Sequence, residues 1–273
     1  MKKNKYLKEL NIPNTQRKNG NNNSRKEVRK IQSWLCLQER MNPGIGSMTK
    51  VDGDFGPATE IAVKNFQNFI GVTQNGIVSK SLFDKLVKPL KNAFEGATKH
   101  HSMRHTIVEV ARQHLEELPF ELKINGESNS GPWVRSYMDG HEGQWWFWCM
   151  GFVQAIIDQA FTLHDKNFKT MMPLTYSCDT VGVRAMETGA LIRNYKIREN
   201  PGLIQSGDIM LIRKAHLDWT HTAIIIDVDS DTFTTIEGNT NTEGSRNGDG
   251  VYMRVRNFRK SKLDVFSIEN WVN

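Results

Sequence analysis

The chain has 273 residues, which is enough for two domains of ordinary size. Its hydrophobic share of 38%, together with 21 glycines, is typical of globular proteins. No run of about 18 apolar residues occurs, so the sequence predicts no membrane insertion. The first residues are basic but no apolar stretch follows them, and we expect a protein synthesised in the cytoplasm without a recognisable signal peptide.

The net charge of +6 is concentrated at the N-terminus. Residues 1–30 hold ten Lys or Arg and two acidic residues, so the remaining chain is slightly acidic. Because the basic character belongs to a tail, the charge does not predict a nucleic-acid-binding protein. Residues 1–25 are rich in Asn, Lys and Arg and have little to bury, which predicts a flexible basic leader.

The three cysteines, Cys36, Cys149 and Cys178, show no paired spacing. They indicate neither a disulfide framework nor a zinc ribbon. His101 and His105 are four residues apart, but no HExxH motif and no third ligand accompany them. We therefore expect no metal site and no cofactor.

Three short helices are predicted after the leader. Apolar residues recur at helical spacing from Val28 to Leu37. A second helix begins at Pro57 and ends before Gly71, and a third follows Ser79 as its cap. Three such helices in about 65 residues can close a small core.

The segments VDGDFGPAT, AVKNFQNFIGV and NGIVSKSLFDKL follow one another in this region. In this order they resemble the peptidoglycan-binding domain type 1, a three-helix module found beside many cell-wall hydrolases, over residues 26–88. The resemblance implies bacterial peptidoglycan as the partner and Asp54 and Phe55 as wall-binding residues, although both also suit a purely structural role in the loop and core. Residues 89–104 lack sustained periodicity and predict a linker.

The pattern changes after the linker. A helix is predicted at residues 106–117, a second begins at Cys149, and β segments follow from Asp208 onward. Helices followed by an antiparallel sheet predict an α+β domain over residues 105–273.

The stretch WWFWCMGFVQAIIDQAF contains the candidate nucleophile. Met150, Val153 and Ile157 fall on one helical stripe, which places Cys149 at or near the N-terminus of the helix. Free backbone amides and the positive end of the helix dipole favour a thiolate there. The alternative is that Cys149 is a small buried hydrophobic residue.

A candidate base lies in the β region, where SGDIMLI, WTHTAIIIDV and DTFTTIEGN predict three strands. If residues 229–231 form the loop of a hairpin, His221 lies opposite Asn239 and diagonal to Glu237. A slip of one residue would put the groups on opposite faces. The pattern permits a relay in which His221 takes the Cys149 proton and Glu237 orients the imidazole, with Asn239 as the alternative orienting residue.

Other polar and aromatic residues are candidates for the cleft. Glu127 and Asn129 lie in a glycine-flanked loop, where Asn129 could donate to an oxyanion or both could be turn residues. Trp133, Trp145 and Trp146 offer aromatic surface for a sugar or a peptide, although part of this set also suits a core.

The blocks NGESNSGPWVRSYM, WWFWCMGFV, SGDIMLI, THTAIII and TIEGNTN share their order with a known group of hydrolases. Over residues 105–260 they resemble the CHAP cysteine peptidases and amidases, within the NlpC/P60, papain-like superfamily. The resemblance implies a papain-like domain that cleaves amide bonds of peptidoglycan without a metal in the chemistry. It also implies Cys149 as nucleophile, His221 as base and Glu237 as the third polar group.

Together the two resemblances imply an endolysin-like, monomeric peptidoglycan hydrolase. It would be an N-acetylmuramoyl-L-alanine amidase or a peptide endopeptidase that acts on the wall after holin-type release or delivery. A non-catalytic wall-binding protein of a phage particle and an acyl transferase with the same triad are the alternatives.

Overall fold

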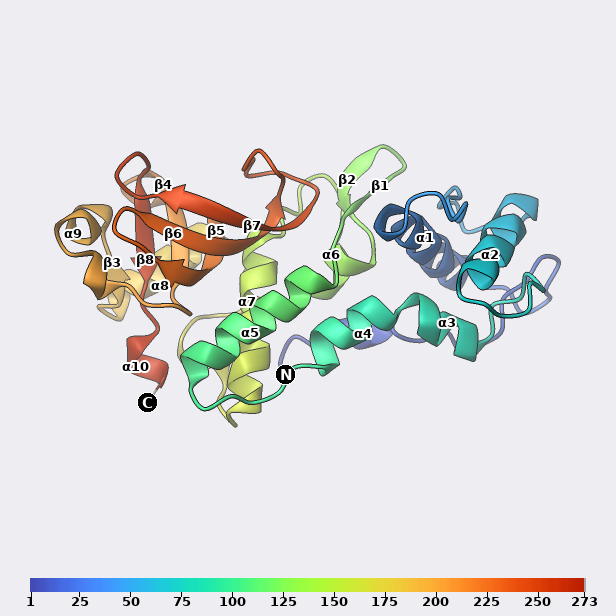
Figure 1. Ribbon diagram of the computed structural model, residues 1–273, viewed down its shortest axis with the longest axis horizontal. Helices are drawn as coiled ribbons and strands as arrows, with labels where there is room; N and C mark the ends of the chain where they lie inside the picture. The colour runs from blue at the N-terminus through green and yellow to red at the C-terminus, as the bar shows by residue number, and fades with distance from the viewer. Residues whose placement is uncertain (273) are drawn as a thin grey trace. The chain divides into compact units, whose positions relative to one another are not determined.

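The structure is a computed structural model that describes residues 1–272 (Figure 1). It mixes helices with antiparallel sheets, which confirms the α+β class. Two compact units divide the chain and are described separately. The helical unit comprises residues 4–92 and 120–144, and the sheet unit comprises residues 1–3, 93–119 and the described chain from Trp145 onward. The domain boundaries expected from the sequence stay a prediction.

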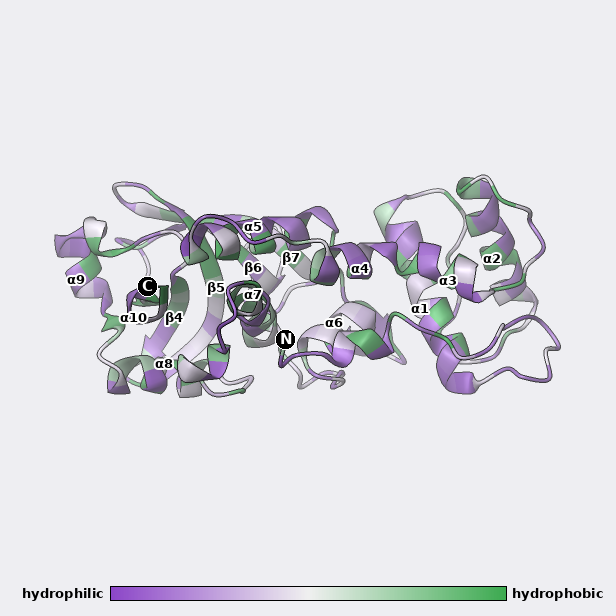
Figure 2. Cartoon of the chain, turned by 90° about the horizontal axis from the view of Figure 1, so that it is seen from below, coloured by the Kyte–Doolittle hydropathy of each residue, from purple (hydrophilic) through white to green (hydrophobic). Residues whose placement is uncertain are grey.

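The helical unit contains the three predicted helices, and α1 contacts both α2 and α3. Figure 2 shows that α1 and α2 carry both hydrophobic and hydrophilic residues, as expected for helices that bury one face. Its elements are η1 (Lys5–Lys8), α1 (Arg25–Met41), α2 (Pro57–Phe69), α3 (Lys80–Leu86), β1 (Leu122–Ile124), β2 (Glu127–Ser130) and α6 (Pro132–Tyr137).

Large aromatic side chains fill the core of the helical unit. Trp34 of α1, Phe66 of α2 and Phe83 of α3 are fully buried. Trp133 of α6 stacks on Tyr137, with ring centroids 6.1 Å apart, and meets Trp34 edge to face at 6.0 Å. The short helix α6 therefore shares one core with the three predicted helices, although it lies far from them in the sequence.

One buried glutamine, Gln32 of α1, holds the loop between α1 and α2. Its Nε2 donates to Asp52 Oδ1, to the Asp54 carbonyl and to Thr59 Oγ1, at 2.9, 2.9 and 3.0 Å. Its Oε1 accepts from the backbone N–H groups of Asp52 and Gly53 at 3.1 and 2.8 Å. The loop requires glycine at Gly53, where φ is +84°.

The leader, residues 1–25, takes part in the helical unit over much of its length. Tyr6 of η1 and Ile12 are buried. Gln16 pairs with Val78 through backbone hydrogen bonds in both directions. The flexibility expected of this segment stays a prediction.

The segment expected to be a linker, residues 89–104, begins inside a helix, α4 (Lys88–Glu95). Pro89 lies in the first turn, where a missing N–H costs no hydrogen bond. Leu90 and Phe94 are buried and four residues apart, so they share one face of the helix. Two apolar residues at this spacing are too few to predict a helix from the sequence.

The sheet unit is built on six antiparallel strands in the order β3-β8-β4-β5-β6-β7. Helix α7 contacts β5, β6 and α5 (Figure 1). The elements are α5 (Met103–Glu116), α7 (Cys149–Leu163), η2 (Phe168–Thr170), α8 (Cys178–Glu187), β3 (Leu191–Ile192), α9 (Asn194–Glu199), η3 (Pro201–Leu203), β4 (Ile209–Ala215), β5 (Asp218–Val228), β6 (Thr232–Thr240), β7 (Gly250–Asn257), β8 (Leu263–Phe266) and α10 (Glu269–Val272).

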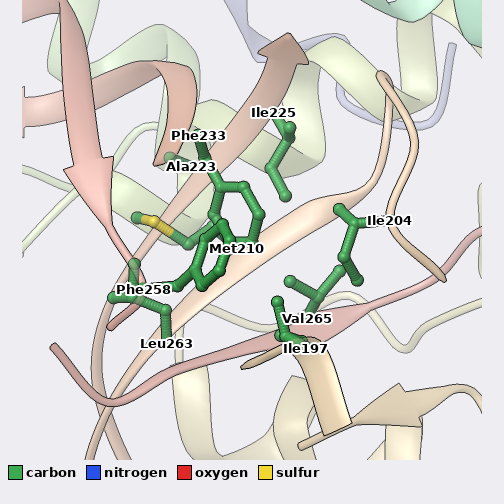
Figure 3. Packing of buried hydrophobic residues seen from close by; sticks show 9 residues of the cluster. All are labelled: Ile197, Ile204, Met210, Ala223, Ile225, Phe233, Phe258, Leu263 and Val265. Carbon is green, nitrogen blue, oxygen red and sulfur yellow. The ribbon is translucent and has the colours of Figure 1, made fainter. Parts of the chain in front are cut away.

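A cluster of buried apolar residues packs beside the sheet (Figure 3). The rings of Phe233 and Phe258 lie 5.0 Å apart in it. Burial of this cluster anchors β4, β5, β6 and β8, and β5 and β6 carry the polar residues His221, Glu237 and Asn239 described below. Its members are Ile197, Ile204, Met210, Ala223, Ile225, Phe233, Phe258, Leu263 and Val265.

The hairpin of β5 and β6 has the predicted three-residue loop, residues 229–231. Val228 faces Phe233 next to this loop. One extra residue of β5 then forms a bulge, after which Ile224 faces Ile236. The bulge shifts the register by one residue for the rest of the hairpin.

Candidate active site

Cys149 is the first residue of α7, as the sequence predicts. Its thiol is free, and the side chain is 4% exposed. The backbone N–H groups of the first helical turn have no partner within the helix, and the N–H of Met150 interacts with the Cys149 sulfur. The helix terminus thus supplies positive potential at the thiol.

His221 and Glu237 form the predicted contact across the hairpin. The Nε2 of His221 lies 2.9 Å from Oε2 of Glu237, and both side chains are fully buried. Extending the register of Ile224 and Ile236 by one residue sets Ala223 opposite Glu237, so His221, two residues away on the same face of β5, is diagonal to Glu237. Without the bulge in β5 the pairing would be displaced by one residue, so the bulge brings the two groups together.

Two residues that the sequence did not suggest hold the Glu237 carboxylate. Arg256 of β7 donates from Nε to Oε1 at 2.7 Å and from Nη2 to Oε2 at 2.5 Å. The Thr235 hydroxyl donates to Oε1 at 2.7 Å. Burial raises the pKa of Glu237, but Arg256 and His221 outweigh it and lower this pKa to about 2. Glu237 is therefore a fixed carboxylate beside the imidazole.

His221 and Cys149 shift the pKa values of one another. Burial lowers the pKa of His221, but interactions with Cys149 and Glu237 outweigh it and raise this pKa to about 9. The Cys178 thiol and His221 lower the pKa of Cys149 well below its usual value, against the effect of burial. Because Glu237 is hydrogen-bonded to Nε2 of the imidazole, Nδ1 is the ring nitrogen that can interact with the Cys149 thiolate. Among residues 1–272, Nδ1 has no partner of regular hydrogen-bond geometry.

Cys178 lies against the candidate nucleophile. Its Sγ is 3.9 Å from Cys149 Sγ, and it is the first residue of α8. Interaction with Cys149, together with burial, raises the pKa of Cys178 well above its usual value, so it stays a thiol. The spacing of the cysteines in the sequence does not indicate this contact. Ser177 caps the helix, and a serine at this position is the local feature of the sequence that could have indicated a helix beginning at Cys178.

Gly238 lets β6 pass close to the start of α7. A Cβ at this position would lie 2.6 Å from the Cβ of Phe152 and 3.0 Å from the ring of Trp148. Glycine is therefore required for the close approach that brings Glu237 and Asn239 near the end of the helix that carries Cys149.

Asn239 is buried and has φ of +58°, a conformation that asparagine tolerates better than most residues. Neither Oδ1 nor Nδ2 of its side chain has a hydrogen-bond partner in the described part of the chain. Glu237, not Asn239, makes the hydrogen bond to His221. The structure therefore leaves the Asn239 amide available for another group.

Exposed aromatic residues lie a few positions before Cys149, separated from it by the buried Trp148. Trp145 is 80% exposed, and Phe147 is exposed as well. Trp146 meets the ring of Tyr176 edge to face, with centroids 5.8 Å apart. Two of the three tryptophans expected to contact substrate therefore lie on the segment that leads to the nucleophile.

The remaining predicted cleft residues belong to the helical unit. Glu127 is exposed on β2. Asn129 is buried, and its Nδ2 donates to the Gln144 carbonyl at 3.1 Å, so its amide stabilises the loop. Trp133 is a fully buried core residue and offers no surface to a substrate.

The two expected wall-binding residues differ in exposure. Asp54 is exposed, and its backbone N–H donates to Asp52 Oδ1 at 2.9 Å. Phe55 is 3% exposed and packs in the core, because the loop held by Gln32 turns its ring inward. Of the pair, only Asp54 has surface to offer a ligand.

Two further properties concern the described part of the chain as a whole. Within residues 1–272, no three His, Cys, Asp or Glu side chains are grouped so that they could hold a metal ion. None of the described helices has the length and apolar character needed to cross a membrane.

Comparison with known proteins identifies part of the helical unit. The zinc D-Ala-D-Ala carboxypeptidase of Streptomyces albus G is 43% identical over 44 residues, which are 16% of this chain and 17% of that protein. The similarity thus spans less than a fifth of the relative. No solved structure matches the chain. Residues 24–86 match the family described as "Putative peptidoglycan binding domain", and the chain therefore carries a peptidoglycan-binding domain at its N-terminal side.

Proposed function

We propose that the protein is a peptidoglycan hydrolase in which Cys149 cleaves an amide bond of the cell wall. The observation that carries the proposal is the buried Cys149 at the start of α7 together with the buried His221 of β5, which lowers the pKa of Cys149 and whose Nε2 lies 2.9 Å from the Glu237 carboxylate. A thiolate beside an imidazolium that is itself held by a carboxylate is the arrangement that nucleophilic amide cleavage requires. The resemblance of residues 105–260 to the CHAP group supports the same chemistry.

In the first half of the reaction the Cys149 thiolate attacks the amide carbonyl carbon. The S–C bond forms, and the carbonyl oxygen gains negative charge that the free N–H groups at the start of α7 can stabilise. His221 then gives its Nδ1 proton to the leaving amine as the C–N bond breaks. Glu237 stabilises the imidazolium before this transfer and keeps the ring oriented.

In the second half, water releases the acyl group. His221, now neutral, takes a proton from a water molecule, which attacks the thioester carbon. The C–S bond breaks, the wall fragment leaves as a carboxylic acid, and the thiolate–imidazolium pair is restored. The exposed Trp145 and the half-buried Trp146 provide aromatic surface for a sugar or peptide near this site.

The peptidoglycan-binding domain has a separate role in the proposal. Attachment to the wall polymer raises the local concentration of the catalytic site without adding contacts at the scissile bond. In this role the protein acts at the cell wall after it has been released or delivered from the cytoplasm.

The decisive experiment is mass spectrometry of the fragments that the full-length protein releases from purified sacculi. A new muramoyl terminus with a free L-alanine amine would identify an amidase, and a new terminus within the stem peptide would identify an endopeptidase. A fragment joined to a non-water acceptor would identify an acyl transferase. Intact sacculi would support a non-catalytic wall-binding protein.

Two controls connect the products with the proposed chemistry. Because the proposed steps use only protein side chains, EDTA is expected to leave product formation unchanged. Strong inhibition that added zinc reverses would contradict the proposal. A thiol-alkylating reagent that modifies Cys149 is expected to stop the reaction, since the thioester can no longer form.

A further inference from the structure

The proposed hydrolysis needs one thiol, but two thiols meet at the site. Cys149 and Cys178 are 4% and 7% exposed, and their sulfurs lie 3.9 Å apart. The third cysteine, Cys36, belongs to the helical unit, where its sulfur donates to the Thr49 carbonyl. A pair of free thiols in contact differs from an isolated buried cysteine, because each sulfur can react with the other.

The fold holds Cys178 in this position through three contacts. Ser177 caps α8 and accepts a hydrogen bond from the N–H of Thr180 at 3.2 Å. Asp179 accepts one from the N–H of Trp219 on β5 at 2.6 Å. A Cβ at Gly182 would lie 2.5 Å from the Trp219 ring, so glycine permits close packing of α8 on β5. Cys178 is therefore fixed relative to the strand that carries His221.

The two sulfurs are close enough for a bond to form after a small movement. A disulfide requires a sulfur separation of about 2.05 Å, so the two atoms must approach by roughly 2 Å. Each cysteine is the first residue of a helix, and rotation about χ1 moves its sulfur without disturbing the rest of that helix. The imidazolium of His221 favours the thiolate form of Cys149, which is the form that reacts with peroxides.

We propose that Cys149 and Cys178 form a reversible disulfide in the presence of hydrogen peroxide, and that this bond switches the catalytic site off. The loss of activity rests on the proposed function, whereas the formation of the disulfide does not. Cys149 is the residue that peroxide oxidises, and Cys178 is the residue that resolves the oxidised sulfur.

The reaction balances in two steps. The Cys149 thiolate attacks one peroxide oxygen, so that an S–O bond forms, the O–O bond breaks and hydroxide leaves. Cys178 then attacks the resulting sulfenic sulfur: the S–S bond forms, the S–O bond breaks, and the Cys178 proton leaves with the departing oxygen as water. Cys149 and Cys178 lose two electrons in total, and hydrogen peroxide gains them.

The test uses the reduced full-length protein. After treatment with hydrogen peroxide, free thiols are alkylated, and the protein is digested without reduction for mass spectrometry. We expect a linked peptide pair containing Cys149 and Cys178, about 2 Da lighter than the two free peptides together. Dithiothreitol is expected to separate the pair and to restore hydrolysis of sacculi to at least about 80% of its starting rate.

Two variants make the result specific. Cys36→Ser is expected to give the same linked pair, because Cys36 takes no part in it. Cys178→Ser cannot resolve the sulfenic acid, so its Cys149 is expected to gain about 32 Da as the sulfinic acid, which dithiothreitol does not reverse. Sulfinic Cys149 in the wild-type protein beside a freely alkylated Cys178 would overturn the proposal, as would a bond to Cys36.

The two proposals can fail separately. If the linked pair forms but the reduced protein releases no wall fragments, the disulfide proposal stands and the proposed hydrolase function is wrong. If the reduced protein releases wall fragments but forms no linked pair, the hydrolase function stands and the proposed disulfide switch is wrong.

Discussion

Two buried amide side chains, Gln32 in the helical unit and Asn239 in the sheet unit, have opposite surroundings. Gln32 uses both ends of its amide in hydrogen bonds to the loop that follows α1. Asn239 is at least as deeply buried, yet neither end has a partner within the described chain. A buried amide without partners is costly, so it persists where a ligand or a reaction uses it.

The same contrast holds for two fully buried histidines of the sheet unit. His114 shares a hydrogen bond with Gln159 at 3.1 Å and packs against the ring of Phe94. In the described structure, Nδ1 of His221 has no hydrogen-bond partner, and the imidazole interacts electrostatically with Cys149. Of these two histidines, the one with satisfied contacts belongs to the architecture, and the one with an unpartnered Nδ1 lies at the proposed site.

The largest effect is expected from Cys149→Ala. This substitution removes the nucleophile and is expected to lower the release of wall fragments by at least about 1,000-fold, while binding to sacculi is retained. The measurement compares the rate of fragment release with co-sedimentation on sacculi. Near wild-type release would contradict the cysteine mechanism.

Glu237→Gln sharpens the assignment of the orienting group. Gln cannot stabilise the imidazolium as a carboxylate does, so turnover is expected to fall about 100-fold, and less than in His221→Ala. Arg256→Lys is the matched control, because it keeps a positive charge beside Glu237 and is expected to reduce turnover less. A silent Glu237→Gln beside a severe Asn239→Gly would assign the orienting role to Asn239.

Asn239→Gly separates activity from stability. Glycine suits the φ of +58° and removes an amide that makes no hydrogen bond, so the free energy of unfolding is expected to change by less than about 1 kcal/mol. Turnover is expected to fall at least about 10-fold if the amide contacts the substrate or the oxyanion. Urea unfolding and fragment release, measured on the same preparation, test both halves.

Much of the fold follows from local sequence signals. Pro57 begins α2, Ser79 caps α3, and Cys149 begins α7, as predicted. The contact of His221 with Glu237 follows from the length of the hairpin loop, but only because the bulge in β5 restores the register that a three-residue loop suggests. A bulge depends on the packing of the whole sheet and leaves no clear mark in the strand itself.

Two contacts of the candidate site that the sequence does not indicate join residues far apart in the chain. Arg256 lies 19 residues from Glu237, and Cys178 lies 29 residues from Cys149. Periodicity identifies which residues share a face of one element, but it does not identify which elements meet. Trp133 and Phe55 were expected to contact ligands and are buried, because an aromatic residue in a short motif suits a core as well as a binding surface.

His114 provides a pH test of the contrast between the two histidines. Burial lowers the pKa of His114 to about 4, from about 6.5 in the unfolded chain. The folded state therefore favours the neutral ring: stability is greatest above pH 6.5 and falls by up to about 3 kcal/mol as the pH decreases to about 4. Urea unfolding of His114→Gln is expected to show less of this decrease, whereas the exposed His216→Gln is expected to retain it in full. Equal pH dependence in both variants would contradict the role of His114.

Gln32→Ala tests the satisfied member of the amide pair and is expected to have the smallest effect of the series on turnover. It leaves the partly buried N–H groups of Asp52 and Gly53 without their acceptor, so the free energy of unfolding should fall by about 2 kcal/mol. The matched control is Asn65→Ala, which removes one exposed hydrogen bond to Gly46 and should cost less than about 1 kcal/mol. Turnover on soluble muropeptides should be unchanged in both variants, since neither residue belongs to the sheet unit. Lost turnover in a stably folded Gln32→Ala would show that a fully bonded amide can also serve the reaction, and it would remove the distinction between Gln32 and Asn239.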